Sequence, residues 1–368
     1  MSAVVERPEK YEDWFVTSAY QNFVKQEGAP LYEGSALEDL ASLELAGWER
    51  RGGKVAYTRL GSQEDYNLQI VEIPPGGHLK PEHHVYDSTM YVMKGRGATT
   101  IWQEGEPKTT VEWQEGSLLT IPLNACHEEF NGSGQEPCRM LFGQNMAYAI
   151  NLYNNLDFIF NNPFKFTDRY SFKDAQFFED EGRHWNLRVW ETNFIPDIRK
   201  FNLDAYPERG QRTAIMRLSM AGTSIGMHVM SVSEGTYATA HRHGPGAHVI
   251  AIDGDGYELL FMPGQEKDRQ KVIARPYAVV APKLNEFHQH FNAGKGEYKM
   301  LAFRGRGLKY GWGHKYDPAS TAQTKDPFKY AYMIGRDQED PAIREEYYQE
   351  LDKNGVTLRL EPIDQRGG

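Results

Sequence analysis

Along much of the chain, apolar and polar residues alternate in short runs that are separated by glycine and proline. The run 68–73 reads LQIVEI, and the run 226–232 reads GMHVMSV. Alternation with a period of two over about four to eight residues is the pattern of a β-strand. The runs gather in two stretches, 51–145 and 211–308, and each stretch holds the succession of short strands that a barrel needs. We therefore expect an all-β dominated fold with two barrels.

Three further segments flank these stretches: an N-terminal arm (1–50), a connector (146–210) and a C-terminal arm (309–368). Because the connector is rich in aromatic residues, we expect it to pack between the barrels instead of acting as a flexible tether. Apolar residues recur at helical intervals in the flanking segments. This pattern predicts short helices over 11–23, 36–48 and 146–155.

The C-terminal arm carries a clear helix signal. Asp340 is a natural N-cap, and Pro341 follows it at the first helical position. Gly355 supplies a residue that tolerates the left-handed conformation of a helix end. A helix over 341–354 follows, so both arms are expected to be partly helical.

Composition and charge narrow the classes of function. The formal net charge is −10 and there is no run of Lys and Arg, so nucleic acid is not an expected partner. No apolar run reaches membrane length and no signal segment is evident, so we expect no membrane partner and a cytoplasmic location. Cys126 and Cys138 are too few for a disulfide framework. The aromatic-rich arms predict a homo-oligomer.

Histidines recur at defined positions in the second stretch. His241 and His243 stand two residues apart, so both project from one face of a strand. His288 follows in a later strand and can close a triangle with them. Three imidazoles that converge inside a barrel make a metal site with open positions. We expect these three histidines to be metal ligands.

His290 is the candidate catalytic residue. It shares a strand face with His288, whereas Gln289 points outward. On a straight strand His290 lies roughly 7 Å beyond His288, which places it beside the ligands unless a bulge brings it in. Its imidazole titrates near neutrality and suits an acid or base. The alternative interpretation is a histidine that only orients a neighbouring strand.

The order of these residues with glycine, proline and asparagine resembles the two sequence motifs of the cupin superfamily. In chain order the residues are Gly235, His241, His243, Gly254, Pro282, His288 and Asn292. The resemblance implies a double-stranded β-helix, or jelly-roll barrel, that commonly holds one metal ion in its mouth. A similar order occurs earlier, over 76–131. The whole chain thus resembles a bicupin.

The first copy departs from the metal-binding pattern. Aligned by their glycines and prolines, the copies place Glu82, His84 and His127 where the second copy has its three histidines. A set of two histidines and one carboxylate is an iron site in other folds, so barrel one is a second candidate metal site. The alternative is a barrel that has lost its metal function.

A narrower resemblance concerns the second copy. His241-Arg-His243 without a following glutamate, together with His288-Gln-His290-Phe-Asn292, resembles the three-histidine iron sites of the gentisate and salicylate dioxygenases. That resemblance implies a gentisate 1,2-dioxygenase-like oxidoreductase that cleaves an aromatic ring with ferrous iron and O2. It also implies that the three histidines hold the iron and that His290 is a pocket residue.

The chemistry of the site is compatible with several functions. Three neutral imidazoles leave the full charge of the ion and adjacent open positions, so a small anionic hydroxy-acid and O2 could bind side by side. Our first hypothesis is an Fe(II) dioxygenase, with Mn, Ni or Zn as alternative ions. The second is a non-oxidative metal-dependent lyase, isomerase or decarboxylase. The third, from a different class, is a metal-free small-molecule-binding or storage bicupin.

Overall fold

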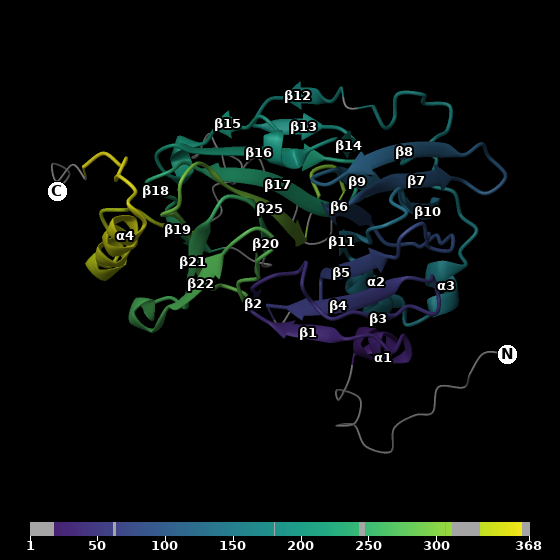
Figure 1. Ribbon diagram of the computed structural model, residues 1–368, viewed down its shortest axis with the longest axis horizontal. Helices are drawn as coiled ribbons and strands as arrows, with labels where there is room; N and C mark the ends of the chain where they lie inside the picture. Colours follow the sequence, from purple (N-terminus) through teal and green to yellow (C-terminus); the bar gives the residue numbers. More distant parts are fainter. Residues whose placement is uncertain are drawn as a thin grey trace, which may run out of the picture.

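The computed structural model describes residues 18–61, 64–179, 181–242, 247–305, 307–310 and 332–362. Strands are the main regular element among these residues, and they assemble into two β-sandwich barrels (Figure 1). The alternation seen in the sequence becomes alternating burial: in β8 (Thr109–Gln114), Val111 and Trp113 are buried and their neighbours Glu112 and Gln114 are exposed. The all-β dominated fold with two barrels is confirmed.

Barrel one packs a larger sheet, ordered β1-β4-β5-β11-β6-β9-β14, against a smaller sheet, ordered β10-β7-β8. Val55 and Val71 of the larger sheet share one core with Ile101 and Trp113 of the smaller. The strands are β1 (Leu31–Gly34), β4 (Lys54–Leu60), β5 (Asn67–Ile73), β6 (Ser88–Lys94), β7 (Arg96–Trp102), β9 (Leu118–Ile121), β10 (Cys126–Asn131), β11 (Cys138–Gln144) and β14 (Phe194–Ile195).

Barrel two repeats this plan. Its larger sheet is ordered β12-β13-β16-β17-β25-β20-β23-β2 and its smaller sheet β22-β21-β24-β19-β26, with β15 beside β16 and β18 beside β24. The strands are β2 (Ala36–Leu37), β12 (Arg183–Trp185), β13 (Val189–Glu191), β15 (Asp204–Ala205), β16 (Thr213–Ser219), β17 (Ile225–Val232), β18 (Thr236–Tyr237), β19 (Ala240–Arg242), β20 (Ala247–Asp253), β21 (Gly256–Phe261), β22 (Gln270–Ala274), β23 (Val279–Val280), β24 (Phe287–Asn292), β25 (Tyr298–Gly305) and β26 (Tyr332–Ile334).

The larger sheets of the two barrels pack against each other. Leu141 of barrel one lies in the same apolar cluster as Leu301 and Phe303 of barrel two. The approach is so close at Gly143 that a Cβ there would lie 2.5 Å from the Phe303 ring. The Tyr277 hydroxyl also donates to the Met93 carbonyl across the interface, at 2.7 Å. The shared core makes the two barrels one packed body.

The N-terminal segment joins both barrels, which corrects one prediction. The helix expected over 36–48 is wrong: β2 (Ala36–Leu37) pairs with β23 of barrel two, and β3 (Ala46–Gly47) pairs with β4 of barrel one. Leu40, between them, is fully buried in the cluster between the barrels. Backbone pairing with two sheet edges and burial of this leucine outweigh the weak helical spacing. Of the other predicted helix, residues 11–17 lie outside the described part of the chain, and α1 (Ala19–Gln26) begins after the capping residue Ser18.

The connector also pairs with both barrels, and the helix predicted over 146–155 is found over Met146–Tyr153. β14 extends the larger sheet of barrel one, whereas β13 and β15 pair with β16 of barrel two. The helices of the connector are α2 (Met146–Tyr153), α3 (Leu156–Phe160), η2 (Ile198–Lys200) and η3 (Pro207–Arg209), and a further short turn, η4 (Glu266–Asp268), lies in barrel two.

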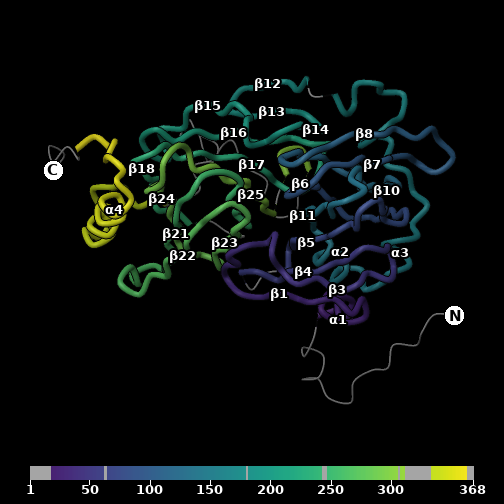
Figure 2. The backbone as a smooth tube through the Cα atoms, in the orientation of Figure 1, coloured from purple at the N-terminus to yellow at the C-terminus, as the bar shows by residue number. Residues whose placement is uncertain are grey.

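The C-terminal helix is confirmed as α4 (Pro341–Asn354), with Asp340 as its N-cap and Gly355 in the left-handed conformation at its end. Its buried residues Ile343 and Tyr347 pack on the outer face of the smaller sheet of barrel two. α4 and α1 lie at opposite ends of the molecule (Figure 2). Both helices cover barrels.

In the part of the chain that the structure describes, none of the helices combines the length and apolarity needed to cross a bilayer. Cys126 and Cys138 are both free thiols, and Cys138 is buried.

Candidate metal centre

The histidines of barrel two lie on neighbouring strands of its smaller sheet. His241 on β19 stands directly opposite His288 on β24. The outer face of β24 carries Gln289, whose side-chain amide donates to Glu339 at 3.2 Å, and Phe291, which packs near α4. His288 and His290 therefore face the barrel interior, as the period of two predicts.

Three of these imidazoles converge. One ring nitrogen from each of His241, His288 and His290 lies within 4.8 Å of the others, and all three residues are at least 95% buried. The ring centroids of His241 and His288 are 3.8 Å apart, and those of His288 and His290 are 5.5 Å apart. The His290 ring nitrogen therefore lies closer to those of the other two histidines than the roughly 7 Å expected along a straight strand. His243, the remaining predicted ligand, lies outside the described residues.

A buried glutamate fixes the orientation of His290. Glu258 lies opposite His290 on β21, and its Oε2 is 2.5 Å from the His290 Nδ1. The Tyr298 hydroxyl donates to the other carboxylate oxygen at 2.8 Å. A carboxylate that accepts from Nδ1–H leaves Nε2 as a lone pair, which is the usual arrangement behind a metal-binding histidine. Sequence reasoning missed Glu258, although an inward-facing glutamate in an apolar strand was a usable signal.

Arg209 is a second residue that sequence reasoning missed. It ends η3, within the segment assigned to the connector, and is only 7% exposed. Its Nη2 lies 2.6 Å and 2.7 Å from the two ring nitrogens of His241. Burial, with a contribution from nearby Arg217 and Arg304, lowers the pKa of Arg209 to about 10. The guanidinium is still charged at neutral pH, so barrel two holds a buried cation next to its histidines.

Barrel one brings together the second predicted set. Ligand atoms of Glu82, His84 and His127 lie within 4.8 Å of one another. The Nδ1 of His84 is 2.9 Å from the Tyr86 carbonyl, and the Nδ1 of His127 is 2.6 Å from a Glu129 oxygen. Both rings thus present Nε2 as a lone pair. The His127 Nε2 is buried and has no hydrogen-bond partner among the described residues.

Two arginines distinguish this set from the one in barrel two. The Glu82 carboxylate is paired with Arg50 and with Arg51, whose Nη1 is 3.1 Å away. Arg51 also contacts Glu129 at 2.8 Å. Burial by itself raises the pKa of Glu129, but Arg51 and His127 outweigh it and lower that pKa to about 2. Each Glu82 oxygen thus contacts a guanidinium, and a cation at this carboxylate would lie beside two positive charges.

The two sets therefore fit a divalent ion to different degrees. Barrel two offers three imidazoles, and the Glu258 carboxylate orients that of His290. In barrel one the orphaned Nε2 of His127 suits a cation, but the ion pairs of Glu82 compete with it. The set in barrel two consists of histidines alone, and the Arg209 guanidinium lies against one of them, His241.

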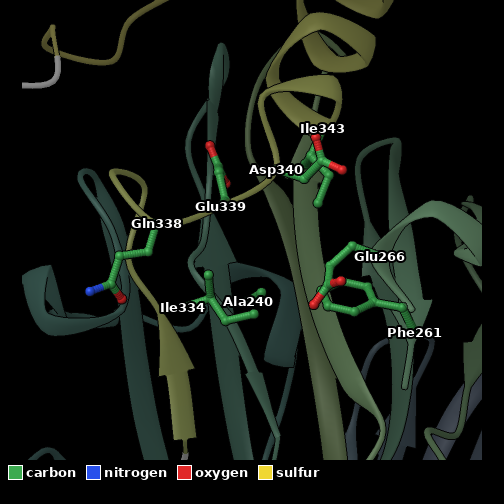
Figure 3. A pocket seen from close by; sticks show the side chains of 8 residues that line it. All are labelled: Ala240, Phe261, Glu266, Ile334, Gln338, Glu339, Asp340 and Ile343. Atoms are coloured by element: carbon green, nitrogen blue, oxygen red, sulfur yellow. The ribbon is translucent and has the colours of Figure 1, made fainter. Parts of the chain in front are cut away.

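A cavity of about 300 Å³ lies on the other side of the sheet that carries these histidines. It is lined by Ala240, Phe261, Glu266, Ile334, Gln338, Glu339, Asp340 and Ile343 (Figure 3). Ala240 precedes His241 and faces outward, toward the start of α4 (Figure 3). This hollow is separate from the candidate metal centre.

Similar proteins were found among solved structures. No family model matches the sequence, and no curated protein matches it. Oxalate decarboxylase from Bacillus subtilis at pH 4.6 is 14% identical over 76% of this chain and 77% of its own, with a TM-score of 0.48. Vicilin from Corylus avellana (hazelnut) is 13% identical over 73% and 84%, with a TM-score of 0.46. The 7S globulin of Momordica charantia is 12% identical over 73% and 83%, with a TM-score of 0.45.

These likenesses include an enzyme and seed proteins, and they carry no argument about activity. The chain itself holds two β-sandwich barrels, each with a cluster of candidate ligands.

Proposed function

We propose that barrel two is a divalent-metal centre and that the protein is a metal-dependent enzyme acting on a small anionic substrate. The observation that carries the proposal is the convergence of three buried imidazoles, from His241, His288 and His290, within 4.8 Å. His243, which the sequence predicts as a ligand together with His241 and His288, lies outside the described residues. For the particular reaction, we propose a dioxygenase that uses Fe(II), consistent with imidazole ligands that also suit Zn and Ni.

Each residue of the site would have a separate role. His241 and His288 hold the ion from two adjacent strands, so the sheet fixes their separation. Glu258 keeps His290 in one tautomer and fixes the orientation of its ring. The bound ion would supply positive charge and open positions for a chelating acid and O2. The burial of the site excludes water that would compete with the substrate.

The proposal is tested by metal content and oxygen consumption. The purified protein is depleted with a chelator, reloaded anaerobically with Fe(II), Mn(II), Ni(II) or Zn(II), and analysed for metal per chain. Oxygen uptake is then followed with gentisate, salicylate and aliphatic hydroxy-acids. We expect about one ion in barrel two and uptake only with Fe(II).

Two variants locate the site. His288→Ala is expected to lose most of this metal, because it removes one of the converging ligands. His228→Ala serves as the matched control, since His228 lies on β17 of the opposite sheet and outside the ligand set. Conversion of the substrate by the metal-loaded protein without oxygen uptake would favour a non-oxidative lyase or decarboxylase. A folded protein that binds no metal would leave only the metal-free binding function.

A further inference from the structure

Each barrel begins with an arginine in the same position. Arg51 stands just before β4 and is followed by Gly52, and Arg209 stands just before β16 and is followed by Gly210. Both side chains are almost fully buried, and both reach their barrel's candidate ligand set. The arginine is thus part of the internal repeat, although the strand motifs do not include it.

In barrel one the charge of this arginine is neutralised within the chain. The Arg51 guanidinium contacts a Glu82 oxygen at 3.1 Å through Nη1 and a Glu129 oxygen at 2.8 Å through Nη2. The fork of the guanidinium therefore holds two carboxylates, one from each side of the ligand set. A buried cation with two such partners is a satisfied group.

In barrel two both of those carboxylates are replaced by imidazoles. The alignment of the copies puts His241 opposite Glu82 and His290 opposite Glu129. Within the described residues, the Arg209 guanidinium makes no ion pair, and its contact is with the ring of His241. Glu258, the buried carboxylate of this site, is held instead by His290 and Tyr298.

The position of Arg209 is fixed by its main chain. The backbone N–H and the hydroxyl of Thr239 both donate to the Arg209 carbonyl, at 2.8 Å and 3.1 Å. Thr239 lies two residues before His241, so the arginine and the metal ligand are tied to one segment. A cation held in this way has little freedom to turn toward solvent.

We infer that Arg209 is the anchor for a carboxylate of the substrate, which binds to its guanidinium beside the histidines of barrel two. This inference rests on the proposed function and names the recognised group. A buried arginine is costly without an anion, and a carboxylate can accept two parallel hydrogen bonds from its fork. The bound carboxylate takes the role that the Glu82 and Glu129 carboxylates have for Arg51 in barrel one.

The consequence is selectivity for charge. A neutral amide of the same shape cannot neutralise the guanidinium and would place an N–H against it. Discrimination at such a site is strong, because the wrong ligand leaves a buried charged group unpaired. Substrates of this protein are therefore carboxylic acids, and their amides are excluded.

The test compares two acids with their amides. The acids are salicylate and glycolate, and the neutral probes are their amides, salicylamide and glycolamide. Each compound is titrated calorimetrically into metal-loaded wild type, Arg209→Gln and Arg188→Gln. Arg188 is the matched control, because it is a partly exposed arginine that contacts the Ala205 carbonyl and Glu208 near η3 and does not reach the histidines. We expect Arg209→Gln to weaken binding of an acid by about tenfold to a hundredfold. We expect Arg188→Gln to bind like wild type.

Metal content of each variant separates this inference from the proposed function. Arg209→Gln with full metal and weakened acid binding supports the anchor. Full metal and unchanged acid binding overturns it, and loss of metal overturns it in favour of a role in holding His241. If wild type binds no metal, the proposed function fails, and the same titrations on the metal-free protein still decide whether Arg209 binds the acid. If Arg209→Gln does not fold, wild type decides: equal affinity for an acid and its amide overturns the inference.

Discussion

His290 Nδ1 lies 2.5 Å from the Oε2 of Glu258, and both residues are buried. The two face each other across β24 and β21, so the barrel itself creates the contact. In barrel one the corresponding carboxylate is Glu129, which lies on the same strand as the histidine that it contacts, His127. The two barrels thus use different residues to pair a carboxylate with a histidine of the site.

Replacement of this carboxylate should weaken metal binding. Glu258→Gln keeps the shape but removes the charge that orients His290, and outer-sphere carboxylates of this kind typically contribute about tenfold to a hundredfold in metal affinity. We expect a loss in that range in a competition titration with a chromophoric chelator. Glu112→Gln, at an exposed position of β8, is the control. Equal affinities of the two variants would show that Glu258 has only a structural role.

The role of His290 is decided by metal content and turnover of one variant. Since its ring nitrogen lies within 4.8 Å of those of His241 and His288, we expect His290→Ala to lose most of the metal. Retention of the metal, with turnover lowered by about a hundredfold and one limb lost from the pH profile, would instead assign His290 as an acid or base.

His243 is tested in the same way. The sequence predicts it as a ligand, and His243→Ala should then lose most of the metal. Metal content equal to that of wild type would remove His243 from the ligand set.

A buried histidine between the barrels should make stability depend on pH. His248 packs edge-on against Tyr66 at 4.5 Å, and neither of its ring nitrogens has a hydrogen-bond partner among the described residues. Burial lowers the pKa of His248 to about 3. Because the unfolded chain takes up this proton first, the free energy of unfolding falls as the pH drops from about 6.5 toward 3, by up to about 1.4 kcal/mol per pH unit.

His248→Phe keeps the ring and removes the titrating group. We expect the drop in urea midpoint between pH 7 and pH 5 to be smaller in this variant than in wild type. An identical drop in both proteins would contradict the assigned cause.

The close approach of the barrels at Gly143 should not tolerate a side chain. A Cβ at this position would lie 2.5 Å from the Phe303 ring, so Gly143→Ala forces the larger sheets apart. Overpacking of this kind typically costs about 1–3 kcal/mol. Gly47→Ala is the matched control, because no atom lies within 4 Å of its added Cβ. Equal thermal midpoints of the two variants would argue against the tight contact.

The features that depend on local pattern could be predicted from the sequence. Alternation of apolar and polar residues predicted the strands of both barrels, and period two placed His288 and His290 on one face with Gln289 on the other. The N-cap Asp340 and Gly355 predicted the bounds of α4. These are properties of neighbouring residues, so backbone geometry alone links the pattern to the structure.

The other features of the fold and the site could not be predicted in this way, because they depend on contacts between residues far apart in the chain. The segment 36–48 has helical spacing, yet it forms β2 and β3 since two sheet edges accept it. Glu258 and Arg209 reach the histidines only when their strands and turns are packed together, and no short motif contains them. The convergence of His290 with His241 and His288 likewise depends on how β19 and β24 lie in the folded sheet, which a straight-strand distance does not capture.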